Sequence, residues 1–140
     1  MNEDEEIIPE EDLPPFELPA NSKRTTFILK EKIADMIKYG KPVVAQFPRR
    51  KRQTANEIRQ SMLTMYRLAI IIEKKYYKKT TLQELDVELD ILRHFVRLAQ
   101  DKDYYGPNIA PPLSFKKYTV WSAKLDEIGR IIGGYMKAVK

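Results

Sequence analysis

The stretch TLQELDVELDILRHFVRLA, residues 81–99, decides the class of fold. Its apolar residues recur at alternating steps of 3 and 4 residues. That spacing places them on one face of an α-helix, because a helix completes a turn in about 3.6 residues. The buried stripe that we predict for this helix consists of Leu82, Leu85, Leu89, Leu92, Val96 and Ala99.

Two further stretches have the same spacing. One predicted helix begins at Thr54 and ends at Lys78-Lys79, and another begins after Ser114, a favourable N-cap residue. The T-x-x-E spacing at Thr54 and again at Thr81 predicts a capping box at the start of two helices. The two predicted stripes are Ile58, Met62, Met65, Ala69, Ile72 and Tyr76, and then Tyr118, Trp121, Leu125, Ile128, Ile132 and Tyr135.

A fourth helix is predicted from about Thr26 to Phe47, and Pro48 ends it. Gly40-Lys41-Pro42 interrupts the pattern, so we expect a kink or a short break there. The core residues expected from this helix are Phe27, Ile33, Ile37, Val44 and Phe47.

The fold class that follows is all-α, an antiparallel up-and-down four-helix bundle over residues 23–140. Near-heptad stripes favour small crossing angles, and short connections make the first three helices antiparallel neighbours. The connection over residues 103–113 is longer and contains Gly106-Pro107 and Pro111-Pro112. Residues 1–22 are interrupted by four prolines, and residues 1–20 carry eight acidic and no basic side chains. This composition predicts a flexible, disordered acidic tail.

No feature of the sequence favours catalysis, a metal or a cofactor. Cysteine is absent, His94 is the single histidine, and the spacings of phosphate-binding glycine loops do not occur. Glu84, Asp86, Glu88 and Asp90 alternate, so they spread around their helix rather than converge on an ion. The absence of cysteine favours a cytoplasmic location. The longest apolar run, Leu68–Ile72, is too short to cross a bilayer, so we expect no membrane partner.

The distribution of charge predicts a nucleic-acid-binding surface. Residues 21–140 carry 25 basic and 12 acidic side chains, a net charge of +13. Several bases fall within a sector of about 100° on the second helix, opposite its core stripe. Arg93 and Arg97 are weaker candidates, because Asp90 and Asp101 lie close enough in sequence to pair with them. The full candidate set is Arg49, Arg50, Lys51, Arg52, Arg59, Arg67, Lys74, Lys75, Lys78, Lys79, Arg93 and Arg97.

Base stacking requires exposed aromatic side chains, and the candidates are Tyr76, Tyr77, Tyr104 and Tyr105, of which Tyr76 also belongs to a core stripe. We therefore expect contacts mainly with the phosphate backbone and little sequence specificity.

Three glycines lie in the last helix, where each costs about 1 kcal/mol relative to alanine. Gly129 and Gly133 share a face, with Arg130 beside them, and this pattern favours close approach by another helix or another subunit. Alternatively, Gly133-Gly134 ends the helix.

Four segments together resemble a known family: Ala45–Arg49, Glu88–Arg93, Val96–Ala99 and, most specifically, LDEIGRIIGGY at residues 125–135. The pattern, over about residues 25–137, is similar to the accessory variability determinant of diversity-generating retroelements. The resemblance implies a homopentamer of four-helix bundles that binds nucleic acid. It also implies a partner reverse transcriptase and its template RNA, in support of mutagenic retrohoming, with no polymerase activity of its own.

The alternative is a structural or adaptor bundle of the ribosomal intervening-sequence type, whose basic face binds an acidic protein. That family's typical segment in the second helix is only partly echoed by Asn56–Ser61, and Lys74–Lys79 replaces its turn.

Overall fold

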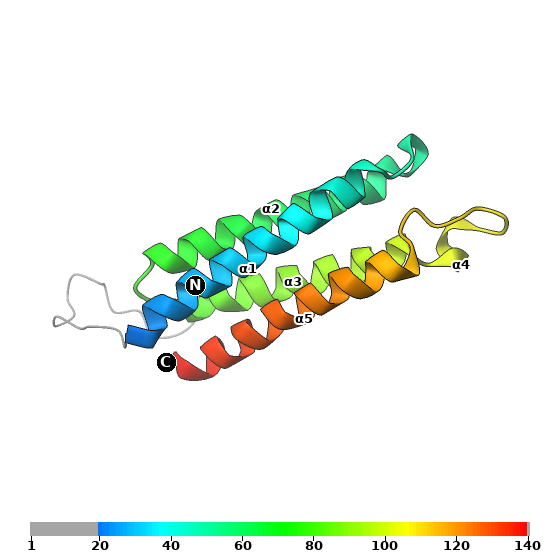
Figure 1. Ribbon diagram of the computed structural model, residues 1–140. Coiled ribbons are helices and arrows are strands. Elements are labelled where there is room, and N and C mark those ends of the chain that lie inside the picture. Colours follow the sequence, from blue (N-terminus) through cyan, green and yellow to red (C-terminus); the bar gives the residue numbers. More distant parts are fainter. Residues whose placement is uncertain (1–19, 140) are drawn as a thin grey trace.

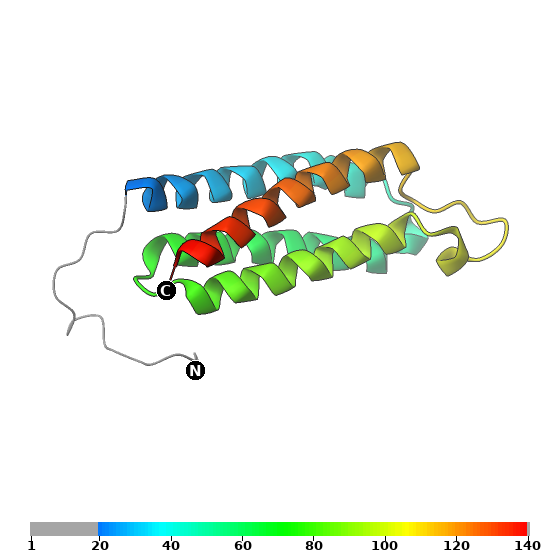
Figure 2. The same ribbon diagram turned by 90° about the horizontal axis from the view of Figure 1, so that it is seen from below.

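The computed structural model describes residues 20–139, and these form an antiparallel bundle of four long helices (Figure 1). Each long helix packs against two others, since α1 contacts α2 and α5, and α3 also contacts α2 and α5. Figure 2 shows α1 and α5 in one layer above α2 and α3. The predicted four-helix bundle is confirmed. The helical elements are α1 (Ala20–Ala45), the 3₁₀ turn η2 (Arg49–Lys51), α2 (Arg52–Lys74), α3 (Lys79–Ala99), α4 (Lys102–Tyr105) and α5 (Phe115–Ala138).

The core is built largely from the predicted stripes. Every stripe residue of α3 is buried, and so are those of α2 from Ile58 to Ile72. In α5, Tyr118 is half-buried and the other five stripe residues are buried. Tyr76 is not part of α2 as predicted, because the helix ends two residues earlier. The predicted end of α2 at Lys78-Lys79 is therefore wrong by one turn.

The first helix differs from its prediction in extent and in register. α1 begins at Ala20, within the predicted tail, and residues 1–19, which hold the rest of that tail, lie outside the described residues. Phe27 is 54% exposed rather than buried, and Ile37 is only partly buried. The hydrophobic side chains that α1 buries are Leu29, Ile33, Met36, Val43 and Val44, with Phe47 just after the helix.

Of the kink or short break expected at Gly40-Lys41-Pro42, the break is absent, because α1 continues through Pro42 to Ala45. Pro42 lies near the helix end on an exposed side, so its missing N–H costs one hydrogen bond at a position open to solvent. Gly40 is buried against α2 and α5. A Cβ atom there would lie 2.6 Å from Cζ2 of Trp121 and 2.8 Å from Sδ of Met62. This glycine permits close packing rather than breaking the helix.

Both predicted capping boxes are wrong. The N-cap residues of α2 and α3 are Lys51 and Lys78, and neither side chain makes a capping hydrogen bond to the start of the helix that it precedes. The turn η2 leads directly into α2, so backbone carbonyls already accept hydrogen bonds from Lys51 N–H and Arg52 N–H. Thr81 is buried and accepts a 3.1 Å hydrogen bond from Nζ of Lys75. The N-cap of α5 is Ser114 as predicted, and it accepts from the Lys117 N–H at 3.2 Å.

Candidate nucleic-acid interface

The outward face of α2 carries a row of exposed basic side chains, Arg52, Arg59, Arg67 and Lys74, which we call the α2 ridge. Among the residues that the structure describes, none of the four forms an ion pair with an acidic side chain. Arg59 donates a 3.1 Å hydrogen bond to Asn56, a neutral residue that does not compensate its charge. The α2 ridge therefore presents positive charge along the length of the helix.

Two apolar side chains lie within the α2 ridge. Leu63 is 61% exposed and lies one turn from both Arg59 and Arg67, and Ile70 is 39% exposed one turn before Lys74. The ridge thus combines charge with exposed apolar surface. Such a surface fits a protein partner as well as a phosphate backbone.

Lys78 belongs to the candidate set, but the structure gives it a structural role. Its side chain is only 6% exposed. Its Nζ atom donates hydrogen bonds to the carbonyl oxygens of Ile72 at 2.6 Å and Lys75 at 2.5 Å. These carbonyls lie at the end of α2, where intrahelical donors run out and a cation favours the helix dipole. Lys78 therefore caps α2, while its neighbours Lys75 and Lys79 are exposed.

Lys51 is also buried, at 7% exposure, and it fastens the linker that joins α3 to α5 (residues 100–114). Its Nζ atom donates a 2.5 Å hydrogen bond to the carbonyl oxygen of Ala110 and lies 4.8 Å from the centre of the Tyr105 ring. Burial lowers the pKa of Lys51, and the nearby charge of Arg50 lowers it further. Tyr105 in turn donates a 3.4 Å hydrogen bond to Thr54, and burial raises the pKa of its hydroxyl.

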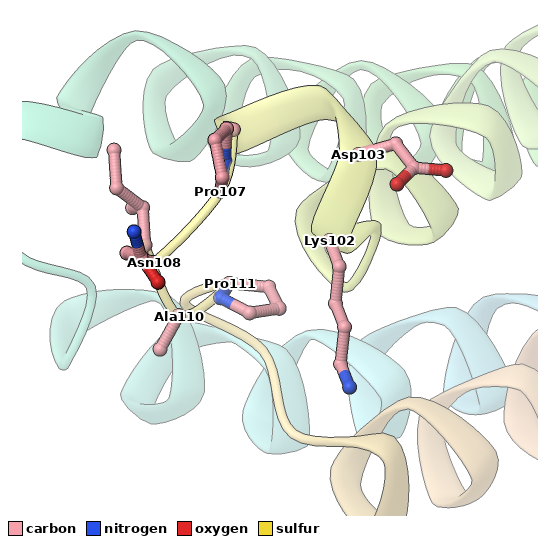
Figure 3. A pocket seen from close by; sticks show the side chains of 8 residues that line it. Lys102, Asp103, Pro107, Asn108, Ala110 and Pro111 are labelled. Atoms are coloured by element: carbon pink, nitrogen blue, oxygen red, sulfur yellow. The ribbon is translucent and has the colours of Figure 1, made fainter.

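The linker also encloses an open pocket of about 590 Å³ beside α4 (Figure 3). Residues 106–111 supply most of its lining, and Gly106 and Asn108 adopt positive φ angles of 99° and 66° there. The charged side chains in it are Lys102 and Asp103. Because these few polar groups do not converge on one point, we assign no small-molecule ligand to it.

The basic residues around this linker gather at one end of the bundle, which we call the linker end. There α1 ends, α2 begins, α3 ends and α5 begins (Figure 1). Arg49, Arg50 and Arg52 are exposed at this end, together with Arg97 in the last turn of α3. The structure thus adds Lys102, Lys116 and Lys117 to the candidate set, three residues that the sequence alone did not single out.

Arg93 lies at the contact of α3 with α5, and its side chain is still 40% exposed. It forms a 3.2 Å ion pair with Asp126 and donates a 3.3 Å hydrogen bond to the carbonyl oxygen of Leu125. The expected pairing of Arg93 with Asp90 is therefore wrong. Gly129 makes room for this side chain, because a Cβ there would lie 2.7 Å from Nη2 of Arg93. The sequence predicted that another helix or subunit approaches closely at this glycine, and the structure shows that the approaching group is the Arg93 side chain of α3.

Gly133 and Gly134 lie inside α5, which runs on to Ala138, so the interpretation that they end the helix is wrong. A Cβ atom at either position would meet no described atom within 4 Å. Arg130, one turn before Gly134, is exposed. Nothing within the described chain requires glycine at positions 133 and 134, which leaves this part of the α5 backbone open to another molecule.

The aromatic candidates divide between the two ends of the bundle. Tyr76 and Tyr77 follow α2, and Tyr77 is 41% exposed, whereas Tyr104 of α4 is 55% exposed at the linker end. Phe115 was missed, although it is the most exposed large apolar residue described, at 72%. It lies three residues before Tyr118, so the spacing in the sequence assigns it to the core stripe of α5. It is nevertheless exposed at the first residue of the helix.

His94 is exposed and its Nδ1 atom lies 2.7 Å from the Asp90 carbonyl oxygen. Over residues 20–139, no group of three or more His, Asp and Glu side chains is placed to hold a metal ion. In the same range, no helix is both long and apolar enough to cross a membrane.

These features define a class: a small antiparallel four-helix bundle whose α2 ridge forms no ion pair with an acidic side chain among the described residues. A family model described as bAvd-like matches residues 27–139, and the chain belongs to that family. The match confirms the resemblance to the accessory variability determinants of diversity-generating retroelements. No curated protein matches the chain.

Proposed function

We propose that this protein is a non-catalytic, nucleic-acid-binding accessory subunit of a diversity-generating retroelement. It associates with a reverse transcriptase and its template RNA in the cytoplasm and supports mutagenic retrohoming. Membership of the bAvd-like family supports this role. The observation that carries the binding activity is the exposed α2 ridge, whose charges have no acidic partner among the described residues. Binding to phosphates releases counterions and draws its affinity from such charges.

The test of this proposal is reconstitution with a reverse transcriptase encoded beside the gene. We expect the protein, the polymerase and the template RNA to elute as one complex from a sizing column. Omission of the protein should reduce cDNA synthesis on that RNA. A polymerase that copies the template equally well alone, and never elutes with the protein, would contradict the proposal.

The second candidate is an adaptor that binds an acidic protein, and exposed Leu63 and Ile70 within the α2 ridge favour it. Leu63→Ser distinguishes the two, because removal of an apolar contact weakens a protein interface without removing charge. If Leu63→Ser abolishes capture of the polymerase and leaves RNA affinity unchanged, this part of the ridge is a protein-binding surface within the proposed complex. The adaptor function alone requires that the wild-type protein bind no RNA at all.

Oligomeric state gives a prediction of its own. We expect a homopentamer, supported by the family and by the open α5 backbone at Gly133 and Gly134. Light scattering at micromolar concentration should therefore give about five times the 16.5 kDa mass of the chain. Gly133→Leu should lower that mass while helix content by circular dichroism stays the same. A wild-type mass near 16.5 kDa would overturn the pentamer.

The acidic N-terminal segment should restrain non-specific binding. Residues 1–20 carry eight negative charges tethered to a body of net charge +13, so they compete with nucleic acid at an effective concentration in the millimolar range. Deletion of residues 1–19 should tighten binding of a labelled duplex at low salt. The gain should shrink as salt rises, because exposed charges are screened beyond about 8 Å at physiological ionic strength. Equal affinities at low salt would assign the segment another role.

A further inference from the structure

The linker end is one continuous surface, because three long-range hydrogen bonds join its segments. Lys117 Nζ of α5 donates to Oε1 of Gln46, just after α1, at 3.1 Å. Lys51 Nζ donates to Ala110 O in the linker at 2.5 Å. The linker also returns to α3, since the Leu113 N–H donates to Ala99 O at 3.2 Å.

This surface is strongly basic. Residues 41–52 and 97–117, which form it, contain nine basic and two acidic side chains. Of the two acidic residues, Asp101 is the N-cap of α4, and its carboxylate accepts a 2.8 Å hydrogen bond from the Asp103 N–H. The field at the linker end is therefore positive and attracts a polyanion.

Two aromatic rings are exposed on the same surface, and each contacts a second ring. Tyr104 is 55% exposed and meets Tyr105 with ring centres 4.8 Å apart. Phe115 is 72% exposed and meets Tyr118 at 6.1 Å. Tyr105 is itself held by Lys51 and Thr54. The supporting rings hold the exposed ones in place, so little conformational entropy is lost when a ligand packs on them.

From this geometry we propose that the linker end is a binding site for single-stranded nucleic acid, in which unpaired bases stack on Tyr104 and Phe115 while the surrounding lysines and arginines contact the phosphates. The inference rests on the proposed nucleic-acid-binding function and adds the strandedness of the ligand. Grooves that bind single strands combine positive charge with aromatic side chains on which bases stack. A duplex keeps its bases stacked internally, so it uses the charges of this surface but not its rings.

The test compares three fluorescent probes with the full-length protein: a single-stranded oligonucleotide, an abasic strand with the same number of phosphates, and a duplex. We expect the base-bearing strand to bind more tightly than the abasic strand. Phe115→Ser and Tyr104→Ser should each weaken its binding by about 10-fold, since stacking of one base contributes on the order of 1–3 kcal/mol. Neither variant should change abasic or duplex binding. Phe115→Trp should retain the wild-type preference.

Tyr77→Ser is the matched control, because Tyr77 is also an exposed ring but lies after α2, at the other end of the bundle. It should leave all three affinities unchanged. Equal binding of base-bearing and abasic strands, or unchanged single-strand affinity in the Tyr104→Ser, Phe115→Ser double variant, would overturn the stacking site alone. Failure of the wild-type protein to bind any of the three probes would overturn the proposed function as well.

Discussion

Replacement of Gly40 by alanine should lower the free energy of unfolding by about 1–2 kcal/mol, and replacement by valine by about 3 kcal/mol or more. The new Cβ would lie 2.6 Å from Trp121 and 2.8 Å from Met62, and Trp121 is fully buried. Alanine recovers about 1 kcal/mol of helix propensity, which the overlap with a rigid ring exceeds. Thermal melting should show a decrease of about 3–5 °C per kcal/mol.

Gly134→Ala is the matched control for this prediction. It adds the same methyl group inside a helix, but no described atom lies within 4 Å of the new Cβ. Within one chain only helix propensity then acts, so the melting temperature should rise as long as light scattering shows the same assembly mass as for the wild type. Trp121→Phe should partly rescue Gly40→Ala, because the atom nearest the new methyl, Cζ2, belongs to the indole. A Gly40→Ala protein that melts at or above the wild-type temperature would show that α1 yields easily at this contact.

The position of Gly40 also shows why the periodic part of the fold was predictable and the first helix was not. In α3, apolar residues at steps of 3 and 4 define one face without help from the rest of the chain, and all of them are buried. In α1, a glycine occupies a core position and a phenylalanine is exposed. Local hydrophobicity therefore identifies Ile33, Val44 and Phe47 correctly but misses Leu29 and Met36. The burial of Gly40 involves Trp121, which is far away in the sequence.

Helix ends were mispredicted for a related reason. Thr54 and Thr81 have the local pattern of N-caps, but the chain enters both helices already turning, and each hydroxyl has a different partner. Lys51 and Lys78 each lie among other basic residues in the sequence, a pattern typical of a solvent-exposed segment. Their burial depends on the carbonyls of Ala110 and Ile72, which only the folded chain brings near. The charge pattern thus located a basic surface but did not separate its exposed basic residues from the buried ones that have a structural role.

Removal of the exposed arginines at the linker end should strongly weaken nucleic-acid binding. We predict that the variant with Arg49, Arg50 and Arg52 all changed to Gln binds a duplex at least about 100-fold more weakly at 50 mM salt. The slope of log affinity against log salt should become shallower by about 2–3, because each lost phosphate contact removes close to one released counterion. Lys51 is left intact, because its substitution would release the linker from Ala110 and confuse a charge effect with a structural one.

The control for charge alone is the triple change of Lys23, Arg24 and Lys137 to Gln. These side chains are also exposed, but they lie at the other end of the bundle, at the start of α1 and the end of α5. Both triple variants lose three positive charges, so a general effect of net charge would act on them equally. We expect the control to keep most of the wild-type slope. Equal slopes for the two variants would place the phosphate contacts away from the linker end, and losses that depend on base sequence would contradict a contact surface directed at the phosphate backbone.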